Sequence, residues 1–267
     1  MTALSVVLCT RSEQGEVPCI RSFEQEAFDD FEVIVRRDDG ISAARNAGIR
    51  AASADKILFV DDDAHPHEDY LQTVVDALDR YDAVGGRVVH PVESPQDELI
   101  RSYCEHYDQG DEERETDRLV GCNMAFRREV LDVVGGFDEN FDWGHEETDM
   151  ARRVRRAGFT IGYVPEMCVT HRYASSLPDL WRKMEALGRA DAYFDRKKGV
   201  SEWERLHWHV PIRRAPTLTE SVVASVAAGC RSLGRFRALL SGVPDVPTEY
   251  PETSARPTAD AGVAGSD

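Results

Sequence analysis

The chain has 267 residues, 42% of them apolar, and a formal charge of −17 from 49 acidic and 32 basic side chains. This composition supports a folded core and excludes collagen-like, disulfide-scaffold and wholly disordered proteins. The acidic excess repels nucleic acid, whose binding needs a basic face, so we expect no nucleic-acid partner.

The first 60 residues alternate apolar runs with helical segments. Leu4 to Cys9 is a continuous apolar run, typical of a strand buried on both faces, and Phe31 to Val35 and Lys56 to Val60 repeat it. Helices are expected between these strands, over Val17 to Phe28 and Ile41 to Ala52. This order predicts right-handed crossovers and a parallel α/β sheet.

Alternating elements continue to about residue 175, where we expect the sheet domain (residues 1–175) to end. The polar segment from 93 to 117 is expected to be irregular or helical and is a candidate substrate loop. The other expected elements are a helix over Pro66 to Tyr81, a strand over Ala83 to His90, an apolar run over Leu119 to Phe126, helices over Arg127 to Val134 and Glu147 to Ala157, and a strand over Thr160 to Val164.

A helical extension is expected over residues 176–243, with apolar positions at helical spacing from Leu177 to Trp208. Beyond it, an apolar stripe accompanies three arginines, which is typical of a helix on an anionic membrane; packing on the domain is the alternative. We expect peripheral membrane contact through residues 212–243 and a disordered acidic tail over 244–267. The stripe comprises Leu218, Val222, Val226, Leu233, Phe236 and Leu240, and the arginines are Arg231, Arg235 and Arg237.

Several features indicate a reduced, cytoplasmic protein. The six cysteines never approach a C-x-x-C spacing, which gives no support to a structural zinc site or a redox pair. The run from Leu4 to Cys9 is too short for a signal peptide, and no apolar run is long enough to span a bilayer. The bias toward Asp and away from Lys is typical of a salt-rich cytoplasm.

Two acidic clusters are candidates for chemistry. Asp61-Asp62-Asp63 directly follows a predicted strand, at the end where open α/β sheets bind ligands. Such hard oxygen ligands indicate Mg²⁺ or Mn²⁺ bound together with substrate phosphates, with a solvated turn as the alternative. The second cluster, Glu146-Glu147-Thr148-Asp149, opens a predicted helix, where a carboxylate could accept a proton from a hydroxyl or merely cap the helix.

The blocks SVVLCTR, GISAARNAGIRAA, KILFVDDDAHP, GCNMAFRREVLDVVGGFDE and HEETDMARRVRRAGF resemble the family 2 glycosyltransferases in order and spacing, over about residues 4–173. The resemblance implies the GT-A fold, a Rossmann-like mixed, mostly parallel sheet flanked by helices. It also implies transfer of a sugar, with inversion, from a nucleotide diphosphate sugar, usually with Mg²⁺ or Mn²⁺. Many relatives act on lipid-linked carriers in N-glycan or surface polysaccharide assembly, and a soluble acceptor is the alternative.

Carried over by position, the resemblance implies roles for individual residues. Glu147 falls at the position of the general base and is followed by Asp149. Asp63 is the expected direct metal ligand, with Asp61 a further ligand and Asp61 or Asp62 nearer the ribose. The remaining implied contacts are Thr10, Arg11, Arg45 and Asn46 to the nucleotide, Gly121, Cys122 and Asn123 on the acceptor side, and His171 to the metal or diphosphate.

The segment from Val35 to Gly40 departs from the family pattern because its loop is shortened. The residue that recognises the base could be Asp38, or it could be absent, so the nucleotide is left open. Two other interpretations are a Mg²⁺-dependent phosphotransferase with Asp61 as nucleophile and Asp63 as acid, and an inactive nucleotide-sugar-binding relative. The phosphotransferase pattern has Thr or Val at the position where this chain has His65. The intact Asp61, Asp63 and Glu147 argue against an inactive relative.

Overall fold

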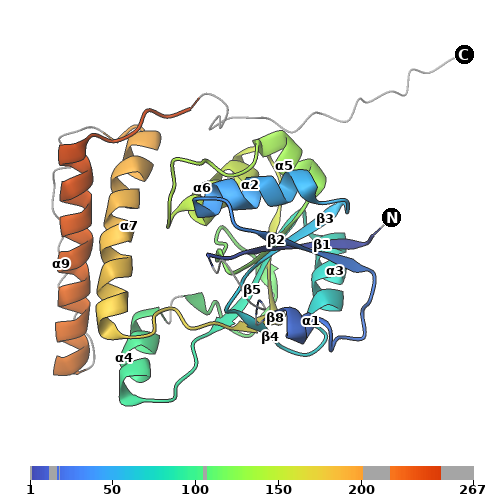
Figure 1. Cartoon of the computed structure of the whole chain (residues 1–267), viewed down its shortest axis with the longest axis horizontal. Helices are drawn as coiled ribbons and strands as arrows, with labels where there is room; N and C mark the ends of the chain where they lie inside the picture. The colour runs from blue at the N-terminus through green and yellow to red at the C-terminus, as the bar shows by residue number, and fades with distance from the viewer. Residues whose placement is uncertain (1, 12–16, 18, 105–106, 201–216, 248–267) are drawn as a thin grey trace, which may run out of the picture.

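The computed structural model describes residues 2–11, 17, 19–104, 107–200 and 217–247. A mixed sheet of eight strands lies at the centre of the molecule (Figure 1). The strands are β1 (Leu4–Cys9), β2 (Phe31–Arg36), β3 (Lys56–Asp61), β4 (His65–Pro66), β5 (Ala83–Val89), β6 (Arg114–Glu115), β7 (Asn123–Arg127) and β8 (Ile161–Thr170). The helices are α1 (Ile20–Phe23), α2 (Ile41–Ala51), α3 (Tyr70–Arg80), α4 (Pro95–Cys104), α5 (Arg128–Val134), α6 (Glu146–Arg156), α7 (Leu177–Lys197) and α9 (Leu218–Ser241).

The strand order is β2-β1-β3-β7-β5-β8-β4, with β6 paired to β8. Strands β1, β2 and β3 are parallel, as the alternating pattern predicts, and so are β5 and β8. Strand β7 lies antiparallel between β3 and β5. The carboxyl ends of β1, β2, β3, β5 and β8 therefore meet at one edge of the sheet, where open α/β sheets bind ligands.

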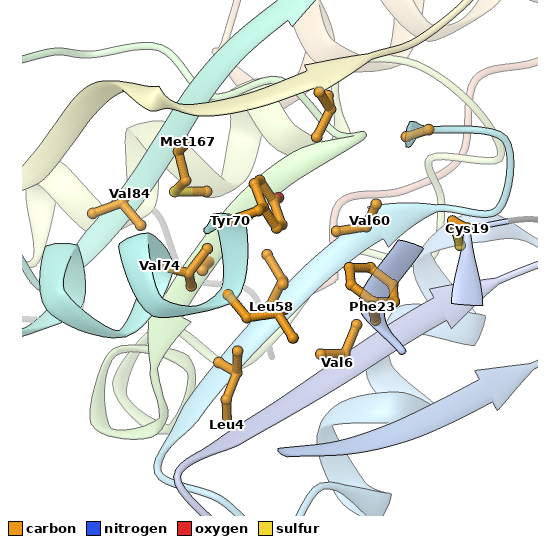
Figure 2. Packing of buried hydrophobic residues seen from close by; sticks show 14 of the residues in the cluster. Leu4, Val6, Cys19, Phe23, Leu58, Val60, Tyr70, Val74, Val84 and Met167 are labelled. Carbon is orange, nitrogen blue, oxygen red and sulfur yellow. The ribbon is translucent and has the colours of Figure 1, made fainter. Parts of the chain in front are cut away.

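Two apolar cores cover the two faces of the sheet. Alternate residues of one strand point to opposite faces, so Val6 and Leu8 of β1 join the core under α1 and α3, whereas Val7 joins the core under α5 and α6. Figure 2 shows the first core, in which Leu58 and Tyr70 lie together. Burial on both faces explains why these strands are continuous apolar runs.

Two predicted helices are shorter in the structure. The helix predicted over Val17 to Phe28 is reduced to α1 and ends in tight turns, after which the Glu26 carboxylate accepts a hydrogen bond from the N–H of Leu71 (2.8 Å) at the start of α3. The helix predicted from Pro66 begins only at Tyr70, because His65–Pro66 pairs with β8 as the short strand β4. The predicted substrate loop contains α4 and β6, and the predicted last strand continues to Thr170.

The two C-terminal helices pack closely against each other. A side-chain carbon on Gly188 of α7 would lie 1.8 Å from the Arg231 carbonyl oxygen, and one on Gly234 of α9 would lie 1.8 Å from the Glu185 carbonyl oxygen. Only glycine fits at both crossing points. Figure 1 shows α7 between α9 and the sheet. The predicted helical stretch from 201 to 208, residues 212–216 and the tail from 248 onward lie outside the described residues.

The composition suggests that the arginines of α9 are available to an anionic membrane beside the apolar stripe. In the structure they are instead paired with acidic residues of α7. Arg231 pairs with Asp191 at 2.6 Å, and Arg235 and Arg237 pair with Asp195 and Glu185, all on α7. The basic groups therefore join the two helices, and the large apolar side chains of the stripe are exposed on the other face of α9.

Candidate active site

A cavity of about 780 Å³ opens at the edge of the sheet where the parallel strands end. Its wall includes Thr10 and Arg11 after β1, Asp61 to Asp63 at the end of β3 and His171 after β8. Helix α7 supplies a further wall through residues such as Lys183 and Leu187. This helix begins after the predicted domain boundary at residue 175, so the C-terminal extension contributes to the site.

Arg45 of α2 connects the two acidic clusters. Its guanidinium is buried and donates hydrogen bonds to Glu146 Oε1 and to the Gly121 carbonyl, both at 2.9 Å. The same group lies 3.6 Å from Asp61 Oδ1. Because α2 is packed against β1, this cation is fixed between the end of β3 and the start of α6.

The aspartates after β3 face His171. The imidazole Nε2 lies 3.1 Å from Asp63 Oδ1 and 3.8 Å from Asp61 Oδ2. Burial raises the pKa of Asp61, against the charges of Arg45 and His171. Desolvation also opposes ionisation of Asp63, but the hydrogen bond from His171 lowers its pKa. The carboxylates thus meet cationic groups from α2 and β8.

The pKa of His171 is raised well above its usual value. Burial opposes protonation of the ring, but Cys122, Asp63 and Asp61 together outweigh it. One carboxylate oxygen of Asp61, the Cys122 sulfur and a ring nitrogen of His171 lie within 4.8 Å of one another. Carboxylates bind Mg²⁺, Mn²⁺ and similar ions, and imidazole binds transition-metal ions, so the donor chemistry of this group fits a divalent cation.

Glu147 and Glu146 open α6 and both line the cavity. Burial and the adjacent charge of Glu146 raise the pKa of Glu147 to about 8, against the opposing charge of Arg45. Glu146 Oε2 is buried without a hydrogen-bond donor among the described residues. A carboxylate with a pKa close to neutral is suited to accept a proton during a reaction.

Three of the expected site residues lie in the scaffold and do not line the cavity. Asn46 exchanges two 2.8 Å hydrogen bonds with the backbone of Phe137. Asn123 is buried, accepts from the Tyr70 hydroxyl at 2.7 Å and donates to two backbone carbonyls. Asp149 is buried and accepts from Arg153 and Lys197. Their polar groups are occupied by these bonds, so these three residues hold the surrounding segments in place and do not face the cavity.

Other expected contacts line the cavity. Thr10, Arg11, Asp38 and Asp62, which are expected at the nucleotide, are in its wall, and so is Gly121, which is expected on the acceptor side. Asp38 is held by a 2.8 Å bond from Arg36 Nε, and this bond lowers the pKa of Asp38 despite a small desolvation cost. Both side chains are about one-third exposed, so Asp38 is accessible from the cavity.

Sequence reasoning gave no individual role to Glu146 or to residues from α7. The signal for Glu146 was its place beside Glu147 at the start of a helix. Lys183 donates to the Tyr173 carbonyl and lies 5.5 Å from the centre of the Tyr173 ring, at the cavity wall. No local motif marks Lys183, because this residue meets the site only after α7 folds back onto the domain.

Two family models match parts of this chain. The model of the family described as "Glycosyl transferase family 2" matches residues 10–135, and the model described as "N-terminal domain of galactosyltransferase" matches residues 103–175. Residues 10–135 belong to glycosyltransferase family 2. The phosphotransferase interpretation therefore has no support; the family 2 match extends through β7 and α5, and the second model also covers α6.

Two relatives of this chain come from Haloferax volcanii. One is named glucosyl-dolichyl phosphate glucuronosyltransferase; it is 28% identical over 193 residues, which cover 62% of this chain and 62% of the relative. The other, glycosyltransferase AglE, is 25% identical over 190 residues, covering 69% of this chain and 61% of the relative. The chain thus spans about three fifths of the length of these two relatives.

The fold of the chain is GT-A. A solved structure of GalNAc-T7 with UDP, GalNAc and Mn²⁺ aligns with a TM-score of 0.51 at 15% identity, covering 76% of this chain and 53% of that chain. At this identity the likeness concerns the fold alone. Within the described part of the chain, none of the helices combines the length and apolar character needed to cross a bilayer.

Proposed function

We propose that this chain transfers a sugar from a nucleotide diphosphate sugar to an acceptor hydroxyl, with inversion at the sugar carbon. The observation that carries the proposal is one cavity that holds both acidic clusters, with Arg45 between them. The aspartates after β3 and the glutamates of α6 then have separate tasks, one toward the diphosphate and one toward the acceptor.

In the proposed reaction the acceptor oxygen forms a bond to the anomeric carbon as the bond from that carbon to the diphosphate oxygen breaks. The electron pair of the broken bond leaves with the diphosphate, and the hydroxyl proton passes to the Glu147 carboxylate. A hydroxyl is a weak nucleophile near neutral pH, so a base within reach lowers the barrier. Burial and the neighbouring Glu146, which is held by Arg45, raise the pKa of Glu147 and so favour uptake of that proton.

We assign the binding of Mg²⁺ or Mn²⁺ to Asp61, Asp63 and His171. When bound, such an ion stabilises the negative charge that develops on a diphosphate leaving group. Arg45 is the chain's own buried cation beside Asp61 and contributes positive potential at the same place. Thr10, Arg11, Asp38 and Asp62 are assigned to the nucleotide, since they line the adjacent wall.

The first test is calorimetric titration in high salt with Mn²⁺ and a panel of UDP, GDP and dTDP sugars, followed by a product assay. We expect metal-dependent binding of one donor and, in the variant Asp63→Ala, loss of the metal dependence. The matched control is Asp69→Ala, an exposed aspartate at the start of α3 that lies outside the cavity wall. Donor binding without transfer to any hydroxyl would favour the inactive relative.

We further propose a lipid-linked acceptor and peripheral contact with a membrane through α9. The name of one relative contains a dolichyl phosphate, which supports a lipid carrier. Six large apolar residues of α9 are exposed on one face; Leu218, Val222 and Leu240 reach 83, 54 and 72% exposure. The arginines of α9 are paired with α7, so apolar insertion supplies the attraction, and it persists at salt concentrations that screen charges.

Vesicle sedimentation tests the membrane contact. The double variant Val222→Glu, Leu240→Glu is expected to lower binding to phosphatidylcholine–phosphatidylglycerol vesicles at least about tenfold, because burying each such side chain contributes about 1.5–3 kcal/mol. Val92→Glu is the matched control, since Val92 is 48% exposed and belongs to the segment before α4, not to α9. Equal sedimentation of all three proteins, or release of the wild type by salt, would contradict apolar insertion.

A further inference from the structure

Cys122 lies among the charged groups of the site and belongs to none of the apolar clusters that the described residues form. It is 4% exposed and follows Gly121 just before β7, whereas Asp61 ends β3 and His171 follows β8. Three segments far apart in the sequence thus bring a thiol, a carboxylate and an imidazole within 4.8 Å of one another. By contrast, Cys19 is a member of an apolar core.

We propose that Cys122 is a thiolate ligand of the divalent ion that Asp61 and His171 hold. The proposal rests on the metal-dependent transferase proposed above and names a further ligand of that site. A bond from a metal to sulfur measures about 2.3 Å and one to nitrogen or oxygen about 2.0–2.2 Å, so ligands of one ion lie up to about 4.5 Å apart. The observed spacing reaches this limit with a small movement of the side chains.

The proposed ligand set changes which ion the site prefers. Sulfur is a soft ligand that binds Zn²⁺, Co²⁺ and other transition metals well, whereas Mg²⁺ prefers oxygen. Asp63 is the second carboxylate of the proposed ligand set. Its Oδ1 lies 3.1 Å from His171 Nε2, and its side chain is 61% exposed. A buried sulfur and ring nitrogen with two carboxylates favour Mn²⁺, Co²⁺ and Zn²⁺ over Mg²⁺.

The test uses the full chain and Co²⁺ as the probe, because a thiolate ligand gives Co²⁺ a near-ultraviolet charge-transfer band that oxygen and nitrogen ligands do not give. We expect this band in the wild type and its loss in Cys122→Ser and Cys122→Ala. We also expect Co²⁺ affinity to fall at least about tenfold in both variants, with Mg²⁺ affinity unchanged. Circular dichroism establishes that each variant is folded.

Two other thiols serve as controls. Cys9→Ser changes another thiol of the same cavity, and Cys168→Ser removes the sulfur that lies 3.8 Å from His67; both variants should keep the band. Mn²⁺ binding, followed by the paramagnetic resonance of the free ion, separates this proposal from the proposed function. If Mn²⁺ binds but Co²⁺ gives no thiolate band, or the band survives in Cys122→Ser, the role of Cys122 is overturned. If neither Mn²⁺ nor Co²⁺ binds, the metal dependence of the proposed function is contradicted as well.

Discussion

Replacing Glu147 by Gln is expected to slow sugar transfer about 10²–10⁴-fold while leaving donor binding nearly unchanged, because a general base contributes about that much to a rate. The amide has the size of the carboxylate but cannot accept the acceptor's proton. Glu147 lines the cavity and is not among the residues proposed to hold the ion or the nucleotide. The measurement is the single-turnover rate at saturating donor, with donor affinity determined separately by calorimetry.

The matched control for this variant is Glu129→Gln, the same change on α5 at a side chain that is 55% exposed and lies 3.9 Å from Arg127. Its transfer rate should equal that of the wild type. A normal rate in Glu147→Gln would show that another group accepts the proton.

The pH dependence of the wild type supplies a second readout of the same role. Burial and the charge of Glu146 raise the pKa of Glu147 to about 8, so transfer should rise with pH through about 8 and become flat above it. The residual rate of Glu147→Gln should lack this rise.

The raised pKa also means that Glu147 favours the folded state most below its ordinary value of 4.5, and that this contribution is lost as pH rises through 8. The Gln variant should therefore resist unfolding better than the wild type at alkaline pH.

The strands and their common edge were predictable from the sequence, because their physical causes are local. Burial on both faces produces the continuous apolar runs of β1 and β3, and the aspartates after β3 follow at the edge where ligands bind. The short β4 was not predicted, since a pair of residues becomes a strand only through its pairing with β8. The hydrogen bond between Glu26, after α1, and the N–H of Leu71 likewise joins segments that are distant in the sequence.

The carboxylates of the candidate site were predictable from the sequence, but the contacts that join them to other residues were not. Asp61, Asp63 and His171 were expected at the metal, and the structure places them together. Nothing local in the sequence shows that Arg45 reaches Glu146, 101 positions away, or that Cys122 meets His171. Conversely, Asn46, Asn123 and Asp149 stand in motifs that suggest contact with substrate, yet their hydrogen bonds are made with the scaffold.

Replacing Lys197 by Met is expected to lower the free energy of unfolding by about 3–5 kcal/mol, the usual cost of removing one partner from a buried ion pair. Lys197 is at the end of α7, and its ammonium lies 2.7 Å from Asp138 and 2.9 Å from Asp149, with all three side chains at most 2% exposed. Methionine preserves the aliphatic chain but removes the ammonium from both buried carboxylates, of which Asp149 keeps the ion pair with Arg153 at 2.8 Å. The measurement is urea unfolding at neutral pH.

Lys198→Met provides the control one residue along the chain. Lys198 pairs with Asp195 at 2.9 Å but is 34% exposed, so its loss should change stability by about 1 kcal/mol or less. The double variant Lys197→Met, Asp138→Asn should be less destabilised than the sum of the two single variants, because it removes one of the unpaired charges. Equal unfolding of the Lys197 and Lys198 variants would contradict the buried cluster.

The sign of the pH dependence follows from Asp138. Desolvation opposes ionisation of Asp138, but the hydrogen bond from Lys197 lowers its pKa below 3.8 in the folded chain. The pair therefore stabilises the fold above pH 3.8 and loses this contribution as pH falls further, so the free energies of unfolding of wild type and Lys197→Met should converge in acid.

Asp149 belongs to the same cluster and lies two residues from Glu147 on α6. Loss of Lys197 should then also slow transfer, through displacement of the base, while donor binding at the opposite acidic cluster is retained.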